Sequence, residues 1–219
     1  MRTPRERPTA SVQLVIFDND GVVVDSELLA NGVLSDLLTE QGHPTSLDES
    51  IDTYMGGTLE RVRAVIKERS GRDLPADFDE SYHRRLFDAY ARDLKPVRGI
   101  KSVLDALELP FCLASSGSRD RIVRSLALVG LLDYFTNRIF SAEEVAHGKP
   151  APDLFLHAAS TMGVPAPRCA VVEDSPNGVA AARAAGMTVF GYAGLTPADR
   201  LQGADATFTQ MDGFLHLLR

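Results

Sequence analysis

Short apolar runs recur along the chain. The first, Leu14–Phe17, is rich in β-branched residues, and runs of about four such residues predict buried strands. Further runs that predict strands are Phe111–Ala114, Arg138–Phe140, Cys169–Val172, Thr188–Phe190 and, more weakly, Ala206–Phe208. Strands that are apolar on both faces are typical of parallel sheets covered by helices on each side.

Between these runs the apolar residues change to helical spacing. From residue 99 onward the predicted helices alternate with the predicted strands, and they lie near residues 103–107, 122–129, 153–162 and 179–185. Regular alternation of strands and helices indicates a Rossmann-like, open and mostly parallel α/β sheet.

The segment from residue 26 to residue 95 has a different pattern, with helices and no convincing strand. Apolar residues at helical spacing occupy three stretches, Leu28–Leu38, Leu59–Ile66 and Phe78–Tyr90. We therefore predict an all-helical cap over 26–95, inserted into an α/β core built from 11–25 and 96–219. Residues 1–10 are basic and proline-rich, and we predict that they form a disordered tail.

Unusual polar residues follow the predicted strands or lie in loops beyond them. These residues are Asp18, Asp20, Ser115, Ser116, Lys149, Glu173 and Asp174. Open α/β sheets bind ligands in the crevice outside the carboxyl ends of the strands, so we expect all four stretches to meet there. Carboxylates gathered in a folded protein require a positive partner. With two hydroxyls and one ammonium, this set fits a divalent cation, Mg²⁺, together with a phosphate.

Four motifs resemble those of a known family. They are DNDGVVVDS at 18–26, LASS at 113–116, GKPAPD at 148–153 and VVEDSPNG at 171–178. Each motif alone is compatible with a turn, a helix cap or a solvated loop. In combination, order and spacing they resemble the four signatures of the haloacid dehalogenase-like (HAD) hydrolase superfamily. The sequence is most similar to the branch of β-phosphoglucomutase and small sugar-phosphate phosphatases.

The resemblance implies a phosphatase that acts on a small phosphorylated metabolite, such as a sugar or sugar-acid phosphate. Asp18 is implied to be the nucleophile that forms an aspartyl phosphate. Asp20 would protonate the leaving alkoxide and then activate the hydrolytic water. Lys149 would pair with the phosphate and with the nucleophile. The Ser115 hydroxyl and the Ser116 backbone N–H would hold phosphoryl oxygens.

The implied cofactor is Mg²⁺. Its predicted ligands are the carboxylate of Asp18, the backbone carbonyl of Asp20, the carboxylate of Asp174, and Glu173 either directly or through water. A helical cap above this site would exclude water and contact the leaving group. The turn Met55–Thr58 is either that specificity contact or a plain interhelical turn.

Two other functions compete with phosphate hydrolysis. A β-phosphoglucomutase would need a cap histidine and a cap arginine, but the matching places hold Ala30 and Leu59, so that only Arg61 or Arg63 could substitute. A non-enzymatic phospho-receiver switch also uses an Asp cluster, a hydroxyl residue and a lysine. Such a switch needs no helical insert, and its acidic pair precedes the phosphoacceptor in the chain, whereas Asp18 comes first here.

Charge and composition narrow the partners. The net charge of −7 argues against nucleic acid, and no apolar stretch is long enough to span a membrane. Cys112 and Cys169 lie inside apolar runs without a CxxC spacing, so we expect reduced core thiols and a cytoplasmic location.

Overall fold

The computed structural model describes residues 12–218, so the predicted tail over 1–10 lies outside the described residues. Its centre is a parallel sheet of six strands in the order β3-β2-β1-β4-β5-β6. The strands are Leu14–Phe17 (β1), Phe111–Ser115 (β2), Ile139–Ser141 (β3), Cys169–Glu173 (β4), Thr188–Tyr192 (β5) and Ala206–Phe208 (β6). The central strand β1 pairs on both sides: Ile16 lies opposite Cys112 of β2 and Val171 of β4. The predicted open, parallel α/β fold is confirmed.

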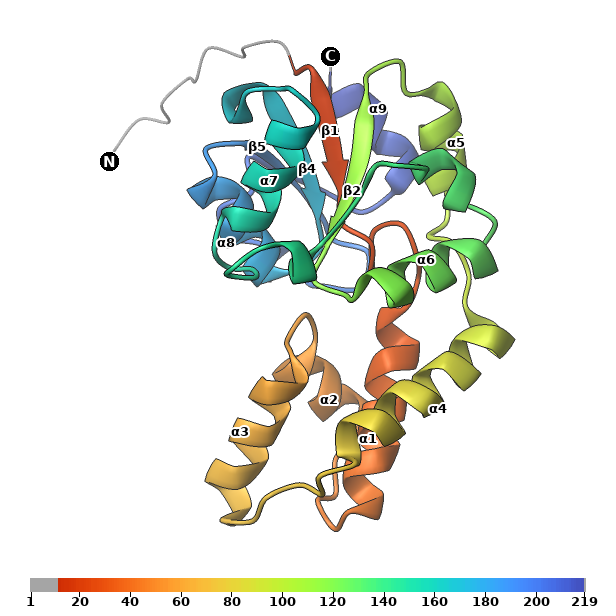
Figure 1. Ribbon diagram of the computed structural model, residues 1–219, viewed down its shortest axis with the longest axis vertical. Coiled ribbons are helices and arrows are strands. Elements are labelled where there is room, and N and C mark those ends of the chain that lie inside the picture. The colour runs from red at the N-terminus through yellow and green to blue at the C-terminus, as the bar shows by residue number, and fades with distance from the viewer. Residues whose placement is uncertain (1–11, 219) are drawn as a thin grey trace.

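Among the described residues, five α-helices follow β1 before β2 begins, one α-helix lies in each of the next three connections between strands, and the last α-helix follows β6 (Figure 1). These helices are Glu27–Glu40 (α1), Leu47–Tyr54 (α2), Leu59–Ser70 (α3), Phe78–Asp93 (α4), Ile100–Ala106 (α5), Arg119–Leu128 (α6), Asp153–Thr161 (α7), Pro176–Ala184 (α8) and Phe214–Leu217 (α9). Within the described residues, no helix is both long enough and apolar enough to cross a membrane.

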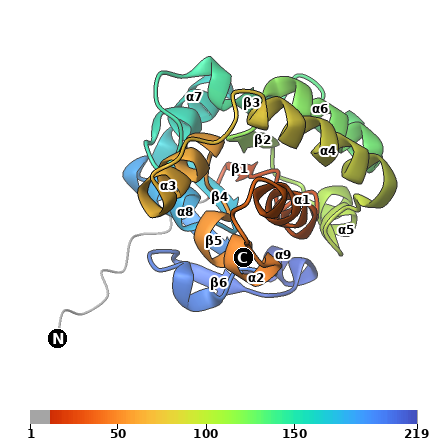
Figure 2. The ribbon, with the colours of Figure 1, turned by 90° about the horizontal axis from the view of Figure 1, so that it is seen from below.

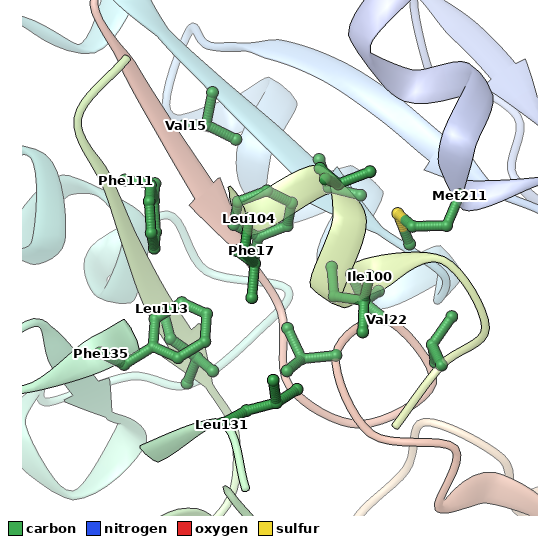
Figure 3. Packing of buried hydrophobic residues seen from close by; sticks show 14 of the residues in the cluster. Val15, Phe17, Val22, Ile100, Leu104, Phe111, Leu113, Leu131, Phe135 and Met211 are labelled. Carbon is green, nitrogen blue, oxygen red and sulfur yellow. The ribbon is translucent and has the colours of Figure 1, made fainter. Parts of the chain in front are cut away.

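Each face of the sheet has its own apolar core, because successive side chains of a strand point to opposite faces. On one face, Phe17 and Leu113 pack with residues of α5, α6 and α9, as Figure 3 shows for part of this cluster. On the other face, Ile16 and Val171 pack against α7 and α8. Cys112 and Cys169 are buried free thiols in this second core, as predicted.

Helices α1–α4 pack around a third apolar cluster, which includes Leu38, Leu86 and Tyr90. They lie at the end of the molecule toward which the strand arrows point (Figures 1 and 2). The two segments that connect them to the sheet run side by side, because the Val97 N–H donates to the Val23 carbonyl (3.0 Å) and the Asp25 N–H to the Lys95 carbonyl (2.9 Å). The exact ends of a cap domain remain a prediction.

Helix α2 was not predicted from the sequence. It is only eight residues long and carries three large apolar side chains, Leu47, Ile51 and Tyr54, so it is too short for apolar spacing to identify a helix. The available signal was its start, where the Ser46 side chain accepts a hydrogen bond from the Glu49 N–H (3.1 Å). A serine followed three residues later by glutamate is a common helix start.

Candidate active site

The end of β1 places two carboxylates at the centre of the site. The Asp18 N–H still belongs to the sheet and donates to the Val172 carbonyl (3.0 Å). Beyond it the chain turns back on itself, and Gly21 adopts a φ of +74°. A Cβ at Gly21 would lie 1.9 Å from Asp174 Oδ2, so glycine is required both for the turn and for the close approach of this carboxylate.

Lys149 lies between two of the predicted carboxylates. Its Nζ is 2.6 Å from Asp18 Oδ1 and 2.7 Å from Glu173 Oε1, and it donates to the Ala114 carbonyl at 3.2 Å. The side chains of Lys149, Asp18 and Glu173 are only 5, 9 and 1% exposed. Three distant parts of the chain therefore meet in one buried ion-pair cluster, as the strand-end argument predicted.

Three carboxylates form a group of the kind that holds a cation. Asp18, Glu173 and Asp174 each offer an oxygen, and these oxygens lie within 4.8 Å of one another. All three residues are buried, and the one ammonium in contact with them leaves an excess of negative charge. Oxygen donors with this excess fit a divalent cation such as Mg²⁺. The Asp20 carboxylate is outside this group, which leaves its backbone carbonyl as the predicted ligand.

The electrostatics of this group show the same excess of negative charge. Burial raises the pKa of Asp18 to about 7 although the Lys149 charge opposes the rise, and the neighbouring carboxylates add to it. Burial, followed by the charges of Glu27 and Glu173, raises the pKa of Asp174 well above its ordinary value. A bound dication would relieve this repulsion and favour the ionised carboxylates.

The Asp20 carboxylate has partners of its own. Its Oδ2 is 2.7 Å from the Arg121 guanidinium, and its Oδ1 accepts a hydrogen bond from the Ser26 hydroxyl at 2.8 Å. The Ser115 hydroxyl is 3.5 Å from Asp20 Oδ2, and it accepts from the Gly117 N–H at 3.1 Å. Asp20 is therefore fixed beside Asp18 and is separate from the Lys149 cluster.

A cavity of about 430 Å³ opens above these groups and extends to the helices α1–α4. All seven site residues predicted from the sequence line it, together with the predicted turn Met55–Thr58. Ser115 is buried at its floor, whereas Ser116 is exposed. The helical wall of the cavity carries Glu27, whose Oε2 accepts from Asn31 Nδ2 at 3.2 Å.

Comparison with known sequences places this arrangement in a family. The profile of the haloacid dehalogenase-like hydrolases matches residues 12–186, which contain every predicted site residue. The chain belongs to the haloacid dehalogenase-like hydrolase family. It is therefore an enzyme of the hydrolase class.

Several HAD-family proteins resemble the whole chain. A 6-phosphogluconate phosphatase of Escherichia coli is 30% identical over 183 residues, which cover 82% of this chain and 81% of that protein. A HAD-like protein of unknown function from Agrobacterium tumefaciens superposes with a TM-score of 0.87 at 38% identity, covering 94% of this chain and 97% of the other. A HAD-family hydrolase from Deinococcus radiodurans, solved with bound phosphate and sodium, gives 0.77 at 31% identity, with 95% and 97% covered.

Glu27 and Arg121 also line the cavity, but neither was predicted from the sequence to be a site residue. Glu27 directly follows the first motif and lies in the first turn of α1. Arg121 lies in the first turn of α6, where the helix dipole disfavours a cation. A cation at this unfavourable position was the sequence feature that could have indicated a site residue. Neither side-chain direction follows from sequence, because it depends on how each helix is rotated against the sheet.

The carboxylate group predicts how metal and pH act on stability. The pKa of Asp18 rises from 3.8 to about 7 on folding, so between these values the folded state binds a proton that the unfolded state has lost. Its contribution to metal-free stability therefore falls as the pH rises through this window, and Mg²⁺ competes with that proton. At pH 8, Mg²⁺ at one hundred times its Kd should add about 2.7 kcal/mol to the stability. The same Mg²⁺ concentration should give a smaller shift in melting temperature at pH 6, because the proton on Asp18 weakens Mg²⁺ binding there.

Thermal unfolding with Mg²⁺ or with EDTA measures this effect at both pH values. Asp174→Asn should lose most of the Mg²⁺ shift, whereas Asp93→Asn, an exposed change in α4, should keep it. A shift that is equal at the two pH values would contradict the assignment of these carboxylates to the metal.

Proposed function

We propose that the protein is an Mg²⁺-dependent phosphatase that hydrolyses a small phosphorylated metabolite, such as a sugar or sugar-acid phosphate, through an aspartyl phosphate. The observation that carries the proposal is the buried contact of Lys149 with Asp18 and Glu173 beside the Asp174 carboxylate. A phosphate dianion can approach a carboxylate nucleophile only where positive charge offsets their repulsion. The phosphatase named among the relatives supports the same substrate class.

In the first step, a carboxylate oxygen of Asp18 attacks phosphorus. A bond forms between Asp18 and phosphorus, the ester P–O bond breaks, and the leaving alkoxide takes a proton from Asp20. In the second step, Asp20 takes a proton from water, the water oxygen attacks phosphorus and the bond to Asp18 breaks. The contacts of Asp20 with Arg121 and Ser26 support both steps, since they hold its carboxyl group in place beside Asp18.

Asp18, Asp174 and the Asp20 carbonyl are proposed to hold Mg²⁺, which would supply charge neutralisation at the phosphate when bound. Glu173 has both oxygens engaged, since Oε1 contacts Lys149 and Oε2 accepts from the N–H and hydroxyl of Ser175, both at 2.9 Å. This pattern supports contact between Glu173 and the metal through water, with Lys149 as its direct partner.

The cap arginines do not support a mutase. Arg63 is used within the helical unit: its guanidinium is 2.8 Å from Asp79 and donates to the carbonyls of Leu74 and Pro75. Arg61 is exposed and is absent from the cavity lining. A second phosphate would therefore lack the cation that a mutase needs to hold it.

The proposal is tested with p-nitrophenyl phosphate and Asp20→Asn. p-Nitrophenolate leaves without acid assistance, so the variant should form the aspartyl phosphate but hydrolyse it slowly, because the base for water is missing. We expect the steady-state rate to fall about 10²–10⁴-fold after a burst of p-nitrophenolate. Intact mass should show one added phosphoryl group, which Asp18→Asn abolishes.

Three results would contradict the proposal. Wild-type turnover that is unchanged by EDTA would contradict the proposed requirement for Mg²⁺. A stable phosphoprotein without turnover would indicate a receiver switch. With hexose 1-phosphates and a bisphosphate primer, interconversion faster than phosphate release would indicate a mutase.

A further inference from the structure

We propose that the leaving-group part of the cavity selects uncharged, hydroxyl-rich alcohols and rejects leaving groups that carry a carboxylate or a second phosphate. The inference rests on the proposed phosphatase function and narrows its substrate class to sugar or polyol phosphates. It depends on which side chains of α1–α4 line the cavity and on which of them carry charge.

The cations that line the cavity are already engaged at its floor. Among the described lining residues, the Lys and Arg side chains are Lys149 and Arg121. Lys149 is held by Asp18 and Glu173, and Arg121 is held by Asp20 at 2.7 Å. Both pair with carboxylates at the floor of the cavity, so their charge is balanced there, and the buried Arg121 Nε has no hydrogen-bond partner among the described residues.

The helical wall contributes negative and neutral polar groups instead. Among the lining residues of 26–95 the carboxylates are Glu27, Glu60 and Asp79, and Asp79 is neutralised by Arg63. The remaining polar side chains of this wall include Asn31, Thr58 and the tyrosines Tyr54 and Tyr82. The exposed His83 side chain also lines this wall.

Glu27 is held in place as a hydrogen-bond acceptor. Asn31 Nδ2 donates to Glu27 Oε2 at 3.2 Å, and Asn31 Oδ1 accepts from the Ser50 hydroxyl at 3.0 Å. Asn31 of α1 and Ser50 of α2 are both buried, so these two hydrogen bonds hold the Glu27 side chain in place. An acceptor fixed in this way favours a donor on the ligand, and a hydroxyl group provides one.

The field at Glu27 disfavours a further anion. Burial, followed by the carboxylates of Asp20 and Asp18, raises the pKa of Glu27 to about 8. A carboxylate on the leaving group would lie near Glu27, and the described helical wall offers no Lys or Arg side chain to balance its charge. A hydroxyl group on the leaving group meets no such repulsion.

The test compares phosphate esters that differ by one carboxylate. The pairs are glucitol 6-phosphate with 6-phosphogluconate, and glycerol 3-phosphate with 3-phosphoglycerate. At about pH 9, above the raised pKa of Glu27, we expect kcat/KM to favour the uncharged leaving group about tenfold or more. Where a pair is not turned over, the two esters are compared by their inhibition constants against p-nitrophenyl phosphate hydrolysis, with the same criterion.

Glu27→Gln keeps the size of the side chain and an oxygen that can accept from Asn31, but removes the negative charge. It should narrow the preference within each pair several-fold, whereas Glu68→Gln, a matched change on the exposed face of α3, should leave the preference unchanged. Equal or better turnover of the acidic esters by the wild type would overturn the inference, as would a preference that Glu27→Gln does not alter. Hydrolysis of p-nitrophenyl phosphate that is absent in the wild type would instead overturn the phosphatase proposal itself.

Discussion

Asp18→Asn is expected to lower phosphatase turnover by about 10⁴-fold or more, as replacement of a covalent nucleophile commonly does. The amide nearly matches the carboxylate in shape, so the buried position beside β4 is kept. It carries no negative charge and is a poor nucleophile toward phosphorus. Asp20 is bound to Arg121 and Ser26, and Glu173 is bound to Lys149 and Ser175, so neither of these neighbours is free to take its place.

Steady-state hydrolysis of p-nitrophenyl phosphate measures this loss, and Asp93→Asn is the matched control on an exposed helix end. Thermal unfolding provides the check on folding. Because burial raises the pKa of Asp18 to about 7, removal of its charge should not lower metal-free stability at pH 8. An Asp18→Asn protein that is folded and keeps a tenth of the wild-type rate would exclude Asp18 as the nucleophile.

The sheet could be predicted because its strands are short apolar runs that end in polar residues. Leu14–Phe17 and Cys169–Val172 are buried on both faces, so their local sequence alone specifies their environment. The gathering of Asp18, Lys149 and Glu173 followed from the rule that the ends of parallel strands share one edge. Their distances and mutual contacts required coordinates.

The wall of the cavity formed by α1–α4 could not be predicted in the same way. Whether Glu27 faces the cavity or the solvent depends on how α1 is rotated, and that rotation is set by the apolar contacts of Leu34 and Leu38 with the other helices. The engagement of Arg63 with Asp79 depends on the packing of α3 against the start of α4. The sequence carries no local signal for contacts of this kind, so the substrate specificity of the site could not be predicted from it.

Lys149→Met is expected to have the largest effect on stability. Methionine fills a similar volume beside Phe155, whose ring centroid is 4.8 Å from Lys149 Nζ. It leaves Asp18 and Glu173 buried near each other without their cation, and removal of one partner of a buried ion pair costs about 3–5 kcal/mol. The free energy of unfolding in urea, measured with EDTA at pH 8, gives this cost directly.

The pH dependence separates this electrostatic cost from lost packing. The Lys149 charge lowers the pKa of Asp18, so in the variant Asp18 should keep its proton to a higher pH and folding should go on losing stability between pH 6 and pH 8. Lys149→Met should therefore be less destabilising at pH 6 than at pH 8. Mg²⁺ should restore part of the stability at pH 8 without restoring turnover, because the phosphate still lacks its ammonium. Lys101→Met removes an exposed ion pair with Asp105 and should cost little at either pH. A cost for Lys149→Met that is small, or equal at both pH values, would mean that the buried carboxylates do not depend on this lysine for their charge balance.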